Sequence, residues 1–426
     1  MRPFKQFLLV LALCPAMLHG QTTLKVMAYN LLNFPEPNPA GKQDTLAKIL
    51  AWHPVDLLIC EEVRTLAGAL LVLNGSLNVD GEDRFSMAAW EPMHSAPGSY
   101  ALQQTLYYDH NKFTLHDQGY LLTYVRDINV YTLYVNDDLL PLTQDTTFIT
   151  VYAVHLKAGN NSSDANERDA MAQVIVDHLA DLPSGRHVIV AGDMNVYSGF
   201  EDAFQTLIDN GNPIVLADPI NTIGGWSNSA FYAAAHTQST RINTIFGDGS
   251  GGGLDDRFDI ALLSAGLMDP ANALHYATGS YRPLGNSGDC FNMNVTNCNT
   301  TITPYPILRS MYYMSDHLPL VLDLEFDGSV GLPSRSAADQ AAIDLVPLPD
   351  GSWEAIIRGL PPAIGSLQVI DAIGHVVYSA TVSTPTDPTR ILLPVMSSGL
   401  FIARFTTNGT SLARTGIATF RHGYHR

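Results

Sequence analysis

Two polar side chains that follow a strongly apolar run are the clearest chemical feature of this sequence. Residues 188–191 read Val-Ile-Val-Ala, which predicts a buried strand, and Gly192 then releases the chain. Asp193 and Asn195 come next, two residues apart, so their side chains face the same side at the strand end. A carboxylate and an amide on rigid backbone suit water activation or hydrogen bonding to a transition state. The tetrapeptide Gly192–Asn195 can also form an ordinary turn, in which both side chains cap backbone amides.

Six further candidate residues lie at or beside the end of a predicted strand. They are Asn30 after the run 23–30, Glu62 after Asp56–Cys60, His155 at the end of Phe148–His155, Asp259 in LDDRFDIALLS, and Asp316 and His317 before Leu318–Phe326. Each alone has a structural explanation, such as a turn residue or a core histidine. Eight together indicate a site. Its oxygen donors favour Mg²⁺, Mn²⁺ or Ca²⁺ over zinc.

The elements that would position these residues alternate between strands and helices. Amphipathic patterns predict helices, and alternating or short apolar runs predict further strands. The helices are Gln43–Trp52, Leu66–Leu73, Asn166–Asp181 and Glu201–Asn210, and the further strands are Ala101–Tyr108 and Lys112–Leu115. The first strand–helix–strand unit would bring Asn30 and Glu62 to neighbouring strand ends.

Six short motifs occur in one order between about residue 23 and residue 326. They are MAYNLLNF, LLICEEV, VYAVHLKAG, VAGDMNVY, RFDIALLS and MSDHLPL. In residue types and order they resemble the endonuclease/exonuclease/phosphatase superfamily, which has the DNase-I-like fold. The resemblance implies an α/β fold, a four-layer α/β sandwich of two packed mixed β-sheets flanked by helices. It also implies metal-dependent hydrolysis of a phosphoester, with Mg²⁺ expected and Mn²⁺ or Ca²⁺ as alternatives.

The resemblance also implies a role for each candidate residue. Asn30 and Glu62 match metal-site positions, with Asp316 as a further ligand. Asp193 and Asn195 match the pair that orients the attacking water and holds the phosphate. His317 matches the imidazole that contacts the scissile phosphate, Asp259 the carboxylate that orients it, and His155 the histidine that stabilises the phosphate or assists the leaving group. Glu61 is a departure, because the family often has Gln there. Glu61 leaves open which of two adjacent carboxylates binds the metal.

The charge of the chain restricts how it could hold a phosphate. The chain has 23 basic and 41 acidic residues, which gives a net charge of −18. Such a surface repels polyanions at long range and makes a broad basic cleft improbable. If the substrate carries phosphate, metal ions are expected to supply the positive charge.

Four segments are predicted along the chain. Residues 1–20 resemble a secretory signal peptide, with Arg2 and Lys5 before a short apolar run, and no other stretch is apolar enough for stable membrane insertion. Residues 21–327 form the catalytic domain, 328–339 a linker, and 340–426 a small all-β, sandwich-like domain.

This last domain resembles the C-terminal sorting domain of bacterial type IX secretion, through LQVIDAIGHVVYSA and LPVMSSGLFIARF. The resemblance implies type IX secretion machinery as a partner and a secreted or cell-surface location, reached through the periplasm. A carbohydrate-binding or adhesion module is the alternative.

The cysteines fit an exported protein. Cys290 and Cys298 lie in a long polar insertion, Asn272–Leu308, and export favours a disulfide between them. Cys60 lies in an apolar run and is expected to be an inert buried thiol.

Some polar and aromatic residues are left out of the predicted site. Arg168 and Arg241 could touch phosphate, but surface salt bridges are the favoured role. His236 is undecided, and Tyr107 and Tyr108 are interpreted as core aromatics.

The leading functional hypothesis is a secreted metal-dependent phosphodiesterase, a nuclease that hydrolyses DNA or RNA with low sequence specificity. A phospholipid (sphingomyelinase-like) or inositol-phosphate hydrolase on the same scaffold is the enzymatic alternative. The insertion Asn272–Leu308 has no contiguous apolar tip, which favours nucleic acid over membrane lipid. A catalytically silent surface adhesion protein is the alternative from another class. The sequence leaves the oligomeric state open.

Overall fold

The structure of the protein is a computed structural model, in which the chain separates into two compact units, Met1–Gly331 and Leu332–Arg426. The structure describes residues 21–36, 40–95, 102–137, 146–328, 342–347, 352–358, 364–371, 375–384, 388–394, 401–407 and 416–418. The predicted signal peptide and all but the first residue of the predicted linker lie outside these residues. The exact domain boundaries therefore stay a prediction.

A seven-stranded mixed sheet forms one half of the first unit. Its strands follow the order β11-β13-β1-β2-β4-β3, with β12 paired to β13. They are β1 (Thr22–Phe34), β2 (Leu57–Val63), β3 (Phe85–Met87), β4 (Gln103–Asp109), β11 (Leu274–Tyr276), β12 (Arg282–Pro283) and β13 (Leu320–Phe326). Strands β1 and β2 run parallel, with Asn30 opposite Glu61, so the ends of both strands lie at the same edge of the sheet.

A six-stranded mixed sheet forms the other half, in the order β5-β6-β7-β8-β10-β9. Its strands are β5 (Phe113–Leu121), β6 (Ile128–Val135), β7 (Phe148–His155), β8 (His187–Asp193), β9 (Leu216–Ala217) and β10 (Asp259–Ser264). In this sheet β7 and β8 are parallel and β10 is antiparallel to β8. The end of β7, the end of β8 and the start of β10 therefore lie side by side.

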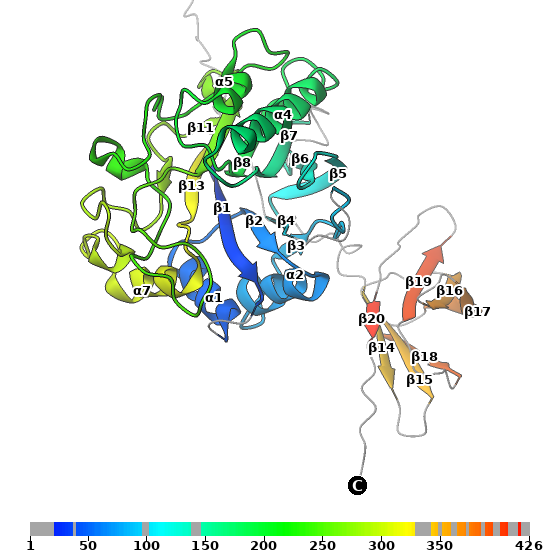
Figure 1. Ribbon diagram of the computed structural model, residues 1–426. Helices are drawn as coiled ribbons and strands as arrows, with labels where there is room; N and C mark the ends of the chain where they lie inside the picture. Colours follow the sequence, from blue (N-terminus) through cyan, green and yellow to red (C-terminus); the bar gives the residue numbers. More distant parts are fainter. Residues whose placement is uncertain are drawn as a thin grey trace, which may run out of the picture. The chain divides into compact units, whose positions relative to one another are not determined.

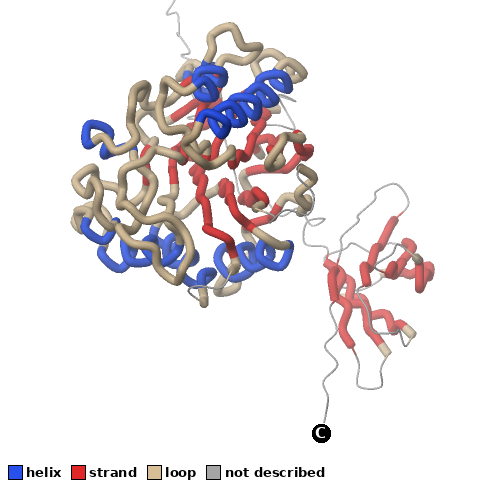
Figure 2. Tube along the Cα trace, viewed as in Figure 1, coloured by secondary structure: helices blue, strands red, loops and turns tan. Residues whose placement is uncertain are grey.

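The two sheets pack face to face, and helices cover both outer faces. Alternation along β1 sends Val26 and Ala28 towards Ile189 and Ala191 of the second sheet, in one buried apolar cluster. The helices are α1 (Lys42–Trp52), α2 (Leu66–Val72), α4 (Ser162–Leu179), α5 (Asp202–Ile208), α6 (Ala265–Met268) and α7 (Tyr305–Met314). Helices α1, α2 and α7 lie on one side and α4 and α5 on the other (Figures 1 and 2). The predicted four-layer α/β sandwich is confirmed.

Two details of the sandwich differ from the sequence-based prediction. Strand β1 does not end at Asn30 but continues to Phe34 through a bulge, where Leu32 and Asn33 have positive φ angles of 48° and 53°. The segment Asn272–Leu308 is not wholly an insertion. Its residues Leu274–Tyr276 form β11 of the first sheet, because Tyr276 and the nearby Tyr281 complete the apolar layer between the sheets.

The second unit is a small all-β structure, as predicted. One sheet contains β14 (Ala342–Pro347), β15 (Trp353–Arg358) and β18 (Thr389–Leu393), and the other contains β16 (Ile364–Asp371), β17 (Val376–Ser383), β19 (Phe401–Thr407) and β20 (Gly416–Ala418). Trp353 and Ile357 of the first sheet share a core with Leu367 and Phe405 of the second. The unit thus has its own buried core.

The cysteines behave as the sequence predicts. Cys290 and Cys298 form a disulfide with Cα atoms 4.9 Å apart, and Cys60 is a buried free thiol. Within the described part of the chain, no helix combines the length and the apolar character that a membrane span requires.

Candidate functional site

The strand ends bring the predicted residues of the second sheet together. His155, the last residue of β7, pairs in register with Asp193, the last residue of β8. Asp193 also pairs with Asp259, the first residue of β10. Gly192 allows this close approach, because a Cβ atom there would lie 2.1 Å from the carbonyl oxygen of Val154. Three ionisable side chains from three strands therefore meet at one edge of the sandwich.

Asn30 connects the two sheets across this edge. Its Nδ2 donates to Oε1 of Glu62 at 3.1 Å and to Oδ2 of Asp193 at 3.2 Å. Its Oδ1 accepts from the backbone N–H of Leu32 at 3.0 Å, inside the bulge that lengthens β1. The bulge also aims the N–H of Asn33 at Oε2 of Glu62, at 2.8 Å. The extra residues of β1 thus fix the orientation of Glu62.

His317 forms a buried pair with Asp259. Its Nδ1 lies 2.8 Å from Oδ2 of Asp259, and its Nε2 lies 3.6 Å from Oδ2 of Asp193. Burial alone would lower the pKa of His317, but the Asp259 and Asp193 carboxylates outweigh it and hold that pKa well above its usual range. The raised pKa favours the positively charged form of His317, and Asp259 fixes the orientation of its ring.

His155 has the opposite electrostatic environment. Its Nε2 lies 3.5 Å from Oδ2 of Asp193 and 4.0 Å from Oε1 of Glu62. Burial, helped by the positive charges of Arg126 and His317, lowers the pKa of His155 well below its usual range. One imidazole of the site is thus neutral while the other is charged.

Asp193 lies between the two imidazoles. Burial raises its pKa to about 7, although His317 acts against this rise. Oδ1 accepts from the backbone N–H of Asn195 at 3.0 Å, and the Asn195 amide donates to the carbonyl of Leu156 at 3.3 Å. A carboxylate with a pKa near neutrality is suited to accept a proton from water.

Asn30, Glu62 and Asp316 fit a hard divalent cation. Burial raises the pKa of Glu62, and the Asp316 carboxylate adds to this effect, so the two carboxylates repel each other. Oδ1 of Asp316 is buried and accepts no hydrogen bond from the described residues. A bound cation would relieve the repulsion and satisfy this oxygen, and an all-oxygen donor set favours Mg²⁺ or a similar ion. The described residues contain one cluster in which three ligand atoms of His, Cys, Asp or Glu lie within 4.8 Å of one another. It consists of Asp289 and the disulfide-bonded Cys290 and Cys298.

Glu61 occupies a different environment from Glu62. It is fully buried, and neither carboxylate oxygen accepts a hydrogen bond from another described residue. Burial, together with the charges of Asp259 and Asp193, raises its pKa well above the usual range. Glu62 accepts a hydrogen bond from Asn30, and its charge interacts with that of Asp316, so Glu62 is the carboxylate that fits the metal site.

Two residues near the site were missed by the sequence analysis. Nη1 of Arg126, in the loop between β5 and β6, donates to the carbonyl oxygens of Leu156 at 2.9 Å and His155 at 3.4 Å. Its charge also interacts with Asp193 and Glu62. The amide nitrogen of Gln238 lies 2.6 Å from Nε2 of His317 and 3.2 Å from Oδ2 of Asp316. Neither residue follows a strand or belongs to a motif, so no sequence signal could have identified them.

Arg168 forms a salt bridge, as predicted, but its side chain is buried and does not lie at the surface. Arg241 is also buried, so the predicted surface position is wrong for both residues. Arg168 pairs with Glu201 and donates to the carbonyl oxygens of Lys157 and Gly159. It therefore joins the chain after His155 to the chain after Asn195.

The other residues that were left out of the site are also accounted for. The Nε of Arg241 donates to the carbonyl of Tyr312 at 2.9 Å. Ring Nε2 of His236 lies 2.7 Å from the carbonyl of Trp226, and Tyr107 is a core residue as predicted.

Solved structures with a similar fold include several at low sequence identity. No protein-family model matches this chain, and neither does any curated protein. Three of the structural neighbours are described as endonuclease/exonuclease/phosphatase proteins. One from Beutenbergia cavernae is 14% identical, with a TM-score of 0.43, 93% of this chain covered and 100% of that chain.

Two further neighbours were solved with a bound group. The human Nocturnin catalytic domain, solved with a sulfate anion, is 18% identical, with a TM-score of 0.45 and coverage of 71% of this chain and 94% of that chain. TDP2 from D. rerio, solved with a single-strand DNA product, is 14% identical, with a TM-score of 0.44 and coverage of 71% and 99%. At this distance the proposal of a function has to rest on the site itself.

Proposed function

We propose that the protein is a metal-dependent phosphoric ester hydrolase that cleaves phosphodiesters. The observation that carries the proposal is the arrangement around Asp193, where a charged His317, a neutral His155 and the oxygen donors near Glu62 surround one carboxylate. Hydrolysis of a phosphodiester needs a base for water and positive charge for the non-bridging oxygens. The described residues offer both.

The residues divide this chemistry between them. Asp193 accepts the proton of the attacking water, and Asn195 holds the water and the phosphate in line. His317 is held by Asp259 and faces the phosphate with its positive charge, while Arg126 adds a second cation. His155 contacts the phosphate or the leaving oxygen. When bound at Asn30, Glu62 and Asp316, Mg²⁺ would withdraw electron density from the phosphoryl group.

Nucleic acid is the proposed substrate, with low sequence specificity. The charge of −18 leaves few basic groups to anchor a strand, so divalent cations are expected to screen the acidic surface. Activity should therefore rise with divalent cation and fall with added NaCl.

A phospholipid substrate is the second candidate, and one observation favours it. The sequence indicated no contiguous apolar tip in the insertion Asn272–Leu308, but outside it Tyr124 is 79% exposed and Phe231 88% exposed. Tyr124 lies two residues from Arg126, and such side chains could dock on a lipid surface.

Incubation of the purified protein with plasmid DNA, RNA and sphingomyelin vesicles tests these proposals, each with Mg²⁺ and with a chelator. We expect nucleic acid cleavage that the chelator abolishes. Hydrolysis of sphingomyelin without cleavage of either nucleic acid would replace the nuclease by the lipid hydrolase. Absence of hydrolysis in all three, with the fold intact, would favour the adhesion protein.

Secretion is also part of the proposal. The signal-like residues 1–20 and the likeness of residues 340–426 to a type IX sorting domain support export through the periplasm to the exterior or the cell surface. The second unit would then bind the secretion machinery and take no part in catalysis.

A further inference from the structure

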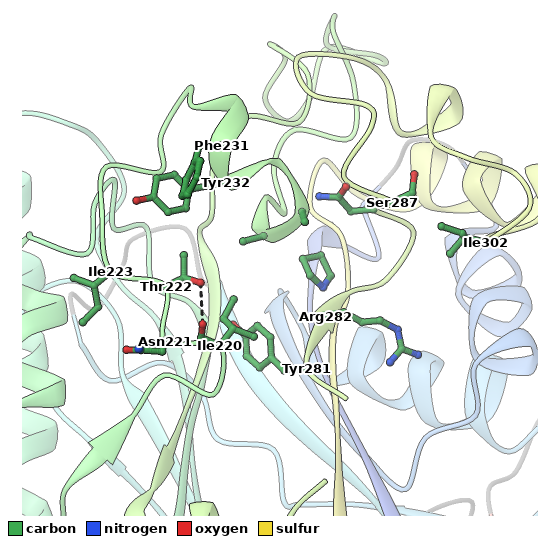
Figure 3. Close-up of a pocket in the computed structure, with 14 residues that line it drawn as sticks. Ile220, Asn221, Thr222, Ile223, Phe231, Tyr232, Tyr281, Arg282, Ser287 and Ile302 are labelled. Carbon is green, nitrogen blue, oxygen red and sulfur yellow. Dashed lines mark hydrogen bonds between the residues drawn. The ribbon is translucent and has the colours of Figure 1, made fainter. Parts of the chain in front are cut away.

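A cavity of about 640 Å³ lies in the first unit (Figure 3). None of its lining residues belongs to the strand-end site, by which we mean the site around Asp193 and His317. One wall consists of residues 220–223 and the short helix η2 (Ala230–Ala235), and the opposite wall of residues 281–287 and Ile302. In Figure 3, Phe231 and Tyr232 lie on one side of the opening, with Ser287 and Ile302 across from them. The cavity is of a size that holds a small-molecule group in known proteins.

The opening of this cavity exposes large apolar side chains to water. Phe231 is 88% exposed, Ile302 60% and Ile223 44%, and all three line the same cavity. Phe231 also packs edge-to-face on Tyr232, with ring centroids 4.9 Å apart. Exposed apolar groups gathered around one hollow are typical of a binding site.

The lining is mixed in polarity and carries no negative charge. Seven of its fourteen residues have polar side chains and none is Asp or Glu, although the chain has 41 acidic residues. A cavity without carboxylates is compatible with a polyanion that passes its opening. Aromatic rings beside polar groups also suit a flat ring with a polar edge better than a hydrocarbon chain, which would leave the polar groups unsatisfied.

The walls are held in place before any ligand binds. The Asn286 amide donates to the carbonyls of Ala233 at 2.7 Å and His236 at 2.8 Å, so it ties one wall to the other. Oγ of Ser287 accepts from the N–H of Asn299 at 2.8 Å, next to the disulfide. A preformed cavity loses little entropy on binding.

The cavity is also connected to the strand-end site. Ala235 lines the cavity, and Gln238, three residues later, contacts His317. Three Cα–Cα steps span at most roughly 11 Å. A strand with its reacting phosphate on His317 therefore has neighbouring nucleotides within reach of the cavity.

We infer that this cavity is a subsite for a nucleobase of the strand whose phosphate reacts at His317. The inference rests on the proposed phosphodiesterase function and names the group of the substrate that binds beside the reacting phosphate. The base stacks on the aromatic side chains at the opening, and its polar edge meets the polar groups of the lining. Stacking of this kind tolerates all four bases, in agreement with low sequence specificity.

The test compares two cavity variants with one control. Phe231→Ala removes the aromatic surface, and Ala234→Trp fills the cavity from an exposed position. Tyr305→Ala is the control, because Tyr305 is also an exposed aromatic residue but does not line the cavity. Fluorescence anisotropy measures binding of a labelled single-stranded DNA oligonucleotide in Mg²⁺, with each variant placed on the inactive Asp193→Asn background. A second assay, on the chain with Asp193 intact, compares turnover of the oligonucleotide and bis(p-nitrophenyl) phosphate in Mg²⁺.

We expect both cavity variants to raise the Kd for the oligonucleotide roughly tenfold and to lower the ratio of kcat/KM for oligonucleotide over the small diester by the same factor. Tyr305→Ala should change neither quantity. An unchanged Kd in both cavity variants would overturn the inference, as would an Asp193→Asn protein with an unaltered cavity that binds no oligonucleotide in Mg²⁺. Loss of sphingomyelin vesicle binding in the variants, with oligonucleotide binding intact, would assign the cavity to an acyl chain. If the protein hydrolyses no phosphodiester while the cavity variants still bind the oligonucleotide more weakly than the unaltered cavity does, the subsite is kept and the proposed function is rejected.

Discussion

At the scale of single residues, the most informative pair is Asp193, the proposed base, and His317, the proposed positive charge. Asp193→Asn removes the proposed base and His317→Ala removes the positive charge, so each should lower kcat roughly 10²–10⁴-fold. Turnover of a phosphodiester and the melting temperature, measured on the same preparations, separate loss of chemistry from loss of fold. Near-wild-type rates in both variants would show that the site assignment is wrong.

The pKa shifts of these two residues set the pH dependence. Burial raises the pKa of Asp193 to about 7, so the base becomes protonated, and activity should fall, as the pH drops through about 7. The pKa of His317 is raised, so its positive charge, and activity with it, should be lost only well above the pH at which an ordinary imidazole loses its proton. The profile of kcat/KM against pH should therefore have two limbs. If the residual activity of Asp193→Asn still falls as the pH drops through about 7, the assignment of Asp193 as the base is contradicted.

Metal binding makes a separate prediction for Asn30 and Glu62. Glu62→Gln removes a charged ligand and Asn30→Ala removes a neutral one, so both should raise the Mg²⁺ concentration for half-maximal activity by at least roughly tenfold. Stabilisation of the melting temperature by Mg²⁺ should weaken in parallel, which is a readout that does not depend on turnover. Glu36→Gln, at a partly exposed salt bridge with Arg64, is the matched control. Equal Mg²⁺ dependence in all three variants would remove Glu62 and Asn30 from the metal site.

At the scale of elements, Arg168 holds the two loops that follow β7 and β8. Its side chain is 1% exposed and donates to Glu201, Lys157 and Gly159, so its removal leaves the Glu201 carboxylate and two carbonyls without their donor. Arg168→Leu should lower the free energy of unfolding by about 3–5 kcal/mol. Urea denaturation measures this change, with Arg390→Leu at an exposed pair as the control, expected within about 1 kcal/mol of wild type. A loss below about 1 kcal/mol in Arg168→Leu would show that the loops hold without it.

The disulfide stabilises another loop, one that the sequence itself identified. Cys290 and Cys298 are eight residues apart, and closing so short a loop contributes on the order of 2–3 kcal/mol by chain entropy. Peptide mapping without reduction should find the two cysteines linked, and a double Cys→Ser variant should unfold at correspondingly lower urea. Two free thiols in the native protein would refute the pairing.

The elements also show what a sequence can and cannot predict. The strands that end in His155 and Asp193 were predictable, because apolar runs, interrupted in β7 only by Thr150, indicated both their type and their ends. The bulge of β1 was not, because Leu32 and Asn33 adopt positive φ angles without a glycine to signal them. Arg126, Gln238 and the burial of Arg168 depend on contacts between distant segments. No local pattern records such contacts.

At the scale of the whole molecule, several of the basic side chains are buried where their charges act on the carboxylates of the site. The net charge is −18, yet Lys42 and Arg241 are buried with their charges acting on Asp316, while Arg126 acts on Asp193 and Glu62. Nζ of Lys42 donates to the carbonyls of Leu31 and Leu32, at 2.6 and 2.5 Å, and burial lowers its pKa to about 8. These internal charges offset part of the repulsion within the carboxylate cluster. They leave the outer surface acidic.

The division of the molecule into two units yields the last prediction. All eight predicted site residues lie in the first unit, and each unit has its own apolar core. A chain shortened to end at Gly328 keeps β13 and the bond from the Asp327 N–H to the carbonyl of Ala273, so it should fold and retain kcat/KM within about twofold. In its native host the shortened chain should accumulate inside the cell envelope, because the proposed sorting domain is missing. Activity assays on the purified protein and immunoblots of the medium and the periplasm measure the two effects separately. A shortened chain that folds but is inactive would give the second unit a part in catalysis, and one that still reaches the medium would remove its role in transport.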